Sequence, residues 1–238
     1  HAFFEGCLPM LHAIGKAHKL FDLGPTRLAI RELIEKTKIN CGFIEGFSCP
    51  SKGLLHIKAD GIKEIVSKIA DNNIKAFKRA NPDKLILGTP EAFLTFSKEK
   101  YFGKVSSFPD ELLKSIKELK NFAPINKTVA IHHACTIEND PFYETIKTIL
   151  GLVPKVNIVE LEKKCGHSGF ENLNGGSKQS AINLMNEAAE KGADVILCTS
   201  PYCESHLLMS QREGSWRSAD ITITDVYRFI LSSIKGDI

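Results

Sequence analysis

Three cysteine-bearing turns in the second half of this chain constrain its fold and function more than any other feature. Each follows or adjoins an apolar run that is typical of a buried strand. The first turn holds Cys135, the second Cys165, and the third the pair Cys198 and Cys203. In an open parallel sheet, the loops at the carboxyl ends of the strands gather at one edge. We therefore expect these thiols to converge and to bind a metal.

Thiolates are the ligands that zinc ions and iron–sulfur clusters prefer. The alternative is that the cysteines are small core residues, because free cysteine is often buried. Their position in glycine- and proline-bearing turns favours the metal site. For Cys198, which ends the apolar run Val195-Ile196-Leu197, the ligand and core interpretations both stay open.

Composition excludes some classes of function. A net charge of +3 is too small to indicate nucleic-acid binding. No apolar run approaches the length of a membrane span, and the first residues do not resemble a secretory leader. The chain has seven cysteines. Without a leader they indicate a reducing, cytoplasmic environment, where cysteines more often bind metal or carry out redox chemistry than form structural disulfides.

Apolar strands alternate with amphipathic helices along the whole chain. We expect strands at 2–4, 84–87, 129–131, 156–161, 195–197 and 221–223, with helices at 11–21, 26–36, 61–78, 109–121, 141–150, 177–191 and 226–234. This alternation predicts an α/β fold with parallel sheets.

The two halves also resemble each other. The segment D-K-L-I-L-G-T-P at 83–90 matches D-V-I-L-C-T-S-P from Asp194. In both F-F-E-G-C at 3–7 and I-H-H-A-C at 131–135, the cysteine comes just after an apolar strand. Any two α/β halves look somewhat alike, but cysteines in corresponding turns favour a duplication. We predict two tandem Rossmann-like α/β halves related by a pseudo-twofold, a cysteine-rich domain at 1–123 and a metal-binding one at 124–238.

These motifs resemble a known family. The turns F-F-E-G-C-L-P, S-C-P-S-K-G, K-C-G-H-S-G and S-P-Y-C-E-S-H are similar to the duplicated cysteine-rich CCG domain found in the B-type subunit of heterodisulfide reductase and in its relatives, over nearly the whole chain. The family pattern is a cysteine, then Cys-Cys-Gly, then Cys-x-x-Cys. In the best-known members, each complete motif holds a non-cubane four-iron cluster, and the pair of clusters cleaves a disulfide.

This chain has lost part of that pattern. Cys135, Cys165 and Cys203 match family ligands, but Lys164 and Ser200 stand where the family has cysteines. In the first half only Cys7 and Cys49 match, with Ser48 in place of a cysteine and no Cys-x-x-Cys. Counting ligands, we expect one metal centre, in the second half only. Its ligands would be Cys135, Cys165, Cys203 and Cys198, and Cys7, Cys49 and His167 are weaker candidates.

The resemblance implies an iron–sulfur redox subunit of a cytoplasmic heterodisulfide-reductase-like complex. It would carry a cluster of the 4Fe–4S type, either ordinary or non-cubane, and transfer electrons in thiol, disulfide or sulfur-compound metabolism. Its implied partners are flavin or iron–sulfur subunits, a paralogous B-type subunit, and a small thiol, a disulfide or a protein-bound sulfur substrate. No catalytic residue is assigned.

Two other functions remain open. One is a structural or interaction subunit with a zinc site or no metal, in which His167 or Cys198 completes the ligand set. The other is a thiol redox pair of Cys198 and Cys203, which lacks the Cys-x-x-Cys spacing. The histidines His132, His133, His167 and His206 are otherwise expected at the surface or in hydrogen bonds.

Overall fold

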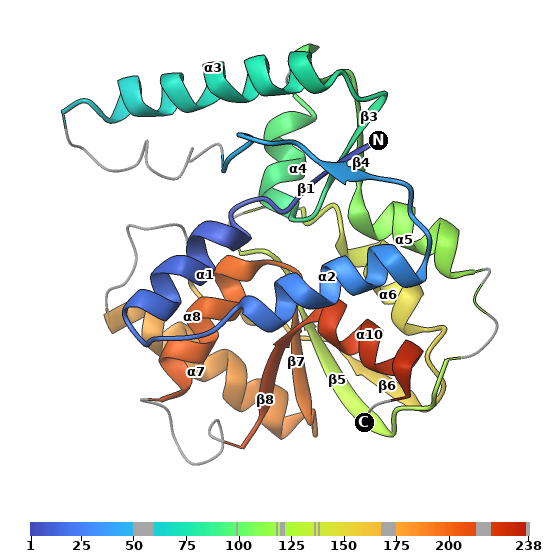
Figure 1. The fold of residues 1–238 in the computed structure, drawn as a ribbon. Coiled ribbons are helices and arrows are strands. Elements are labelled where there is room, and N and C mark those ends of the chain that lie inside the picture. Colours follow the sequence, from blue (N-terminus) through green and yellow to red (C-terminus); the bar gives the residue numbers. More distant parts are fainter. Residues whose placement is uncertain are drawn as a thin grey trace.

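A computed structural model places most of the chain. It describes residues 1–49, 60–98, 100–117, 119, 122–135, 137, 139–167, 175–212 and 220–236. Two parallel four-stranded sheets, each with its own helices, make up the molecule (Figure 1). The predicted α/β class with two similar halves is confirmed.

The first half holds the sheet β2-β1-β3-β4, in which all the pairings are parallel. Its elements are β1 (Ala2–Phe4), α1 (Leu8–Ala17), α2 (Gly24–Lys36), β2 (Gly42–Phe43), α3 (Ile62–Ala80), β3 (Lys84–Leu87), α4 (Pro90–Phe96), the 3₁₀ helix η2 (Lys100–Phe102), β4 (Lys104–Ser107) and α5 (Phe108–Ile116).

The second half repeats this order as β6-β5-β7-β8, again with parallel pairings only. Its elements are β5 (Lys127–His132), α6 (Tyr143–Leu150), β6 (Val156–Val159), α7 (Gly175–Glu190), β7 (Val195–Cys198), α8 (Pro201–Gln211), β8 (Thr222–Asp225) and α10 (Val226–Lys235). Replacing each strand of one half by its counterpart in the other leaves the strand order unchanged, as a duplication requires.

The turns from β3, β7 and β8 into the helices that follow them are short, because capping residues start these helices at once. The side chains of Thr89, Ser200 and Asp225 each accept a hydrogen bond from a backbone N–H in the first turn of α4, α8 and α10. Pro90 and Pro201 occupy the first helical position, where the missing N–H of proline costs nothing. Helix starts are thereby fixed at the carboxyl ends of the strands.

One apolar core joins the two halves. Alternate residues of a strand point to opposite faces of its sheet. Phe3 and Ile86 from the first sheet therefore meet Val129 and Leu197 from the second in one central cluster, together with residues of α1, α2, α5, α6 and α10. The opposite faces pack in two outer clusters, against α3 and α4 in the first half and against α7 and α8 in the second.

Two equivalent helix pairs connect the halves. Helix α2 packs against α10, and α6 packs against α5 (Figure 1). Lys235 and Glu32 form an ion pair at 3.1 Å across the first pair, and Thr145 donates a hydrogen bond to Asp110 at 2.8 Å across the second. Helices α2 and α6 each lie between the first two strands of their half, and α5 and α10 each follow the last. Exchanging the two halves therefore turns one helix pair into the other, as the predicted pseudo-twofold axis requires.

Some elements differ from expectation. The strand expected at 156–161 ends at Val159, and helix α1 begins at Leu8 instead of residue 11. Strand β4 was not expected, because K-V-S-S is short and largely polar. The predicted third cysteine turn is largely the start of helix α8, so Cys203 lies in a helix. The division of the chain into units 1–123 and 124–238 stays a prediction.

None of the helices in the described part of the chain combines the length and apolar character that a bilayer span needs.

Candidate metal centre

Four side chains meet at the carboxyl ends of three neighbouring strands. His132 is the last residue of β5 and Cys135 lies in the turn that follows it. Cys165 lies between β6 and α7, and Cys203 lies in the first turn of α8, just after β7. Because β5 lies between β6 and β7 in the sheet, the three connections leave it side by side.

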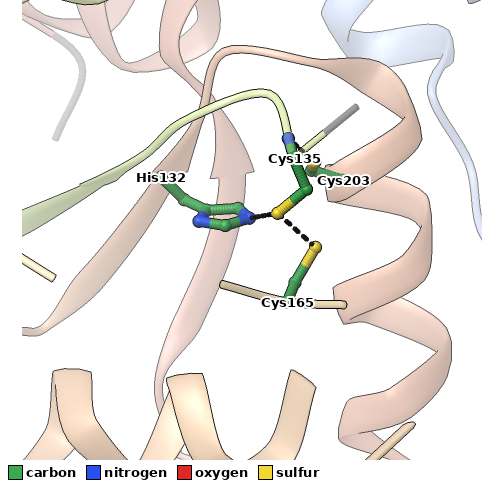
Figure 2. A group of neighbouring side chains, drawn as sticks. All are labelled: His132, Cys135, Cys165 and Cys203. Carbon is green, nitrogen blue, oxygen red and sulfur yellow. Dashed lines mark hydrogen bonds between the residues drawn. The ribbon is translucent and has the colours of Figure 1, made fainter. Parts of the chain in front are cut away.

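The donor atoms of these residues are close together (Figure 2). Cys135 Sγ is 3.2 Å from Cys165 Sγ and 3.3 Å from His132 Nε2. The backbone N–H of Cys135 donates to Cys203 Sγ at 3.3 Å. All four donor atoms lie within 4.8 Å of one another. The predicted convergence of Cys135, Cys165 and Cys203 is therefore observed.

The group is largely buried, and burial together with internal hydrogen bonds shifts the pKa values of its members. Cys165, Cys203 and His132 are almost fully buried. Burial opposes a charged imidazole at His132, but hydrogen bonds with Cys135 and Cys165 outweigh it and raise the pKa of His132 to about 10. Hydrogen bonds from Cys165, Cys203 and His132 lower the pKa of Cys135 far below its ordinary value. Without a metal, these opposite pKa shifts favour a Cys135 thiolate beside a His132 imidazolium.

The pKa of Cys203 shifts in the opposite direction from that of Cys135. Its hydrogen bonds with Cys135 and Cys165, followed by burial, raise the pKa of the Cys203 thiol well above its ordinary value. A cation at the centre of the group would reverse this, because metal binding displaces the protons of thiols and of imidazolium. Metal affinity at this site is therefore coupled to pH.

Three thiols and an imidazole are a soft donor set that fits a metal. Tetrahedral zinc binds sulfur at about 2.3 Å, which puts neighbouring sulfurs about 3.8 Å apart. The Sγ atoms of Cys135 and Cys165 are 3.2 Å apart, so these two sulfurs would have to separate slightly around a zinc ion. Four soft donors within 4.8 Å of one another could hold a metal.

Surrounding hydrogen bonds fix the segments that carry the ligands. Asp140 accepts hydrogen bonds from Ala134 N at 2.9 Å and from the Thr199 hydroxyl, which ties the Cys135 turn to the end of β7. His206 Nε2 lies 3.1 Å from the carbonyl of Cys165 and 3.2 Å from that of Ser177. Such outer contacts orient metal ligands in many proteins.

A small cavity of about 130 Å³ opens onto one side of the group. His132 and Cys135 form part of its wall, and Lys163 and Lys164 lie on its rim. Both lysines are exposed. His133 also lines the cavity, with its ring stacked on Tyr143 at 3.9 Å, and burial lowers the pKa of His133. A small molecule can thus reach the centre past the two lysines and the exposed carboxylate of Glu162, which together carry one net positive charge.

Cys198 is not part of the group. It pairs with His132 in the register of β5 and β7 and is buried in the same outer apolar cluster as Cys165 and Cys203, but it is not among the four residues whose donor atoms lie within 4.8 Å of one another. Burial raises the pKa of its thiol well above the ordinary value. The structure thus places the predicted fourth ligand outside the four donors and puts His132 in its place.

The weaker candidates also lie outside the group. Cys7 and Cys49 come together, as expected, but as a disulfide, which leaves neither sulfur as a thiolate ligand. His167 is buried against Tyr202 and His206, with ring centroids 5.6 and 5.5 Å away, and burial lowers the pKa of His167 to about 4. The histidines were expected at the surface or in hydrogen bonds. His132, His167 and His206 are buried, and hydrogen bonds hold His132 to Cys135 and His206 to the carbonyls of Cys165 and Ser177.

His132 is the functional residue that the sequence interpretation missed. Two signals point to it. It precedes Cys135 by three residues, a spacing that is typical of paired metal ligands. It also shares a face of β5 with Ala130, which packs in the same cluster as Cys165 and Cys203. A histidine at the end of a buried strand, on the face that carries the cysteines, is a ligand candidate.

Comparisons with known proteins agree with the cysteine pattern. The CCG cysteine-rich domain model matches residues 1–97 and again residues 129–208, which together make up well over half of the chain. No curated protein shows significant similarity to the sequence.

Several solved structures of racemases resemble the fold weakly. An aspartate racemase homologue of Pyrococcus horikoshii is 16% identical over 89% of this chain and 92% of its own, with a TM-score of 0.35. The aspartate racemase of Picrophilus torridus is 13% identical over 90% of each chain, with a TM-score of 0.37. A glutamate racemase of Bacillus anthracis is 12% identical over 99% of this chain and 79% of its own, with a TM-score of 0.38. Likeness this low says nothing of activity.

The first family match covers β1, β2 and β3 with the Cys7 and Cys49 turns, and the second covers most of β5 together with β6, β7 and all four residues of the metal-binding group. The chain therefore belongs to the CCG cysteine-rich domain family and carries that domain twice.

Proposed function

We propose that this chain is a metal-binding redox subunit of a heterodisulfide-reductase-like complex, with its metal held by His132, Cys135, Cys165 and Cys203. One observation supports this above the others. The three second-half cysteines that match the family pattern converge with a buried histidine at the strand ends, within 4.8 Å of one another. Soft donors in a buried group are what a redox or structural metal needs.

The family resemblance favours an iron–sulfur cluster of the 4Fe–4S type at this position. Bound there, a cluster supplies one-electron transfer. The three thiolates would hold it, and His132 would replace the thiolate that the chain lacks at Ser200. The cavity flanked by Lys163 and Lys164 would admit a small anionic thiol or disulfide to its edge. In this proposal the chain works in the cytoplasm, with flavin or iron–sulfur partner subunits.

A second candidate is a structural zinc site, favoured by the compactness of the group. Cys₃His is a standard ligand set for structural zinc, with all four donors around one ion. An iron–sulfur cluster distributes its protein ligands over several iron atoms, so its ligands must lie further apart. If the site holds zinc, the chain is a structural or interaction subunit.

Metal analysis of protein purified without oxygen separates the two candidates. We expect iron and acid-labile sulfide in equal amounts, a brown colour, and an electron paramagnetic resonance signal that changes on reduction. One zinc per chain in a colourless protein would contradict the redox proposal and support the structural one. A protein that takes up neither metal on reconstitution would contradict both.

A further inference from the structure

The first half contains the counterpart of the metal-binding group, reduced to two cysteines. Gly88 N donates to the carbonyl of Phe4, just as Thr199 N donates to that of His132. Phe4 therefore occupies the position of His132. Cys7 follows Phe4 by three residues, as Cys135 follows His132.

The same register extends into the following helix. Thr89 and Pro90 start α4 as Ser200 and Pro201 start α8, which aligns Ala92 with Cys203. The first half has thus lost its imidazole and its third thiol. It keeps Cys7 and Cys49, at the places of Cys135 and Cys165, and these two form a disulfide. Among the residues that the structure describes, no third metal-ligating side chain joins these two cysteines, and a pair of thiols suits thiol–disulfide chemistry better than a metal.

This disulfide borders a cavity of about 280 Å³ on the side of Cys49. Phe4, Pro9, Met10 and Phe47 supply most of its wall, so the cavity is largely apolar. Cys49 lines it and Cys7 does not. A small molecule in the cavity is therefore in contact with Cys49 and not with Cys7.

Cys7 is placed to leave as a thiolate. It is the N-cap residue of α1, a helix of 10 residues. The N-terminus of a helix carries a partial positive charge and stabilises a thiolate beside it. The two cysteines thus have different roles, Cys49 as the attacked sulfur and Cys7 as the leaving sulfur.

We propose that Cys7 and Cys49 form a thiol–disulfide exchange site for small, uncharged aliphatic thiols, separate from the metal centre. The thiolate of such a molecule attacks Cys49 Sγ. The Cys7–Cys49 bond breaks, its electron pair goes to Cys7 Sγ, and a mixed disulfide forms on Cys49. A second thiolate attacks the substrate sulfur of that mixed disulfide and releases Cys49. Two substrate thiols become one disulfide, and the protein disulfide becomes a dithiol, with two electrons and two protons transferred.

The proposal is tested first on the unmodified chain. Folded protein is treated with 2-mercaptoethanol or with glutathione at equal thiolate concentration, its free thiols are alkylated, and Cys7 and Cys49 are followed by peptide mass spectrometry. We expect both cysteines to become alkylated together, at least tenfold faster with the uncharged monothiol 2-mercaptoethanol than with charged glutathione. Equal rates with the two thiols, or a disulfide that neither can reduce until the protein unfolds, would overturn the proposal.

Two variants test the assigned roles in the reverse direction, in which Cys49 attacks a small disulfide. Reduced Cys7→Ser and Cys49→Ser proteins are mixed with 2-hydroxyethyl disulfide. Cys7→Ser should accumulate a mixed disulfide on Cys49, because no partner thiol can release it, and Cys7 in Cys49→Ser should react at least tenfold more slowly. The half-exposed Cys41 in the same chains reports the reactivity that exposure alone gives. Equal reaction of Cys7 and Cys49, or reaction of Cys49 no faster than Cys41, would overturn the assignment.

Discussion

At the scale of single residues, the candidate metal centre has no spare ligand within the part of the chain that the structure describes. Cys165 contacts Cys135 within the group, whereas Cys198 and Cys49 lie outside it. Replacing Cys165 by Ala should abolish metal binding, because three donors of the right type would then remain for an ion or cluster that needs four. The variants Cys198→Ala and Cys49→Ala should retain the wild-type metal content. Metal and sulfide analysis of the three proteins checks this, and loss in Cys49→Ala with retention in Cys165→Ala would contradict the site.

His132 can be tested separately from the cysteines. We expect His132→Ala to weaken metal binding by more than about tenfold, because removing even an outer contact of a metal ligand costs 10–100-fold. His132→Cys should restore binding, since a fourth thiolate suits zinc and iron–sulfur clusters alike. His167→Ala is the matched control, because His167 is also buried nearby but lies outside the group. When metal affinity is measured by competition with a chelator, His132→Ala should be the one variant of the three that binds more weakly than wild type.

The sequence predicted three members of the centre and missed one for a physical reason. Cysteines in turns after apolar runs carry a chemical signal, whereas His132 reads as an ordinary strand residue until the face it points to is known. Cys198 shows the converse error. It ends an apolar run as a ligand might and shares a sheet face with His132, but it lies outside the group of four donors. Choosing between these two neighbours requires knowing where the turns place Cys135, Cys165 and Cys203, which the sequence pattern does not show.

At the scale of elements, Glu111 of α5 ties together two strands of the first sheet. Its carboxylate forms an ion pair with Lys84 of β3 at 2.7 Å and accepts a hydrogen bond from Ser106 of β4 at 2.5 Å. Burial opposes ionisation of this carboxylate, but the bonds from Lys84, Ser106 and Lys114 outweigh it and lower the pKa of Glu111 to about 2. A lowered pKa means that the charged form stabilises the fold.

The sign of the pH dependence follows from that shift. The contribution of Glu111 is present above the ordinary pKa of 4.5 and is lost as the pH falls through about 2. Glu111→Gln should therefore lower the free energy of unfolding by about 1–3 kcal/mol at pH 7, and the difference from wild type should vanish near pH 2. Urea titrations across this range measure it, with Glu35→Gln, an exposed position on α2, as the control. A difference that grows as the pH falls would refute the assignment.

At the scale of the whole molecule, the duplication was predictable and the packing of the halves was not. Matching cysteine turns identify the repeat along the chain. They do not reveal that Phe3 and Ile86 of one sheet share a core cluster with Val129 and Leu197 of the other. Apolar periodicity shows which residues are buried within a half, but the partner surface depends on how α2 and α10, and α5 and α6, pack across the pseudo-twofold.

That shared core predicts one cooperative unfolding transition for the whole chain. Leu33 of α2 and Leu197 of β7 are fully buried in the central cluster but belong to different halves. Replacing either by Ala should cost about 2–5 kcal/mol, because each change leaves a cavity in the same core. Leu28→Ala is the control, since Leu28 is 68% exposed and its loss should change stability by less than about 0.5 kcal/mol.

Differential scanning calorimetry of the three variants distinguishes a shared core from two independent ones. With a shared core, Leu33→Ala and Leu197→Ala both move a single transition to lower temperature, and the calorimetric and van't Hoff enthalpies agree. Independent halves would give two transitions, with each substitution shifting only the one that belongs to its own half. A single shared transition would also explain why the chain keeps its first half, which lacks most of the metal ligands. The second half needs the first to complete its core.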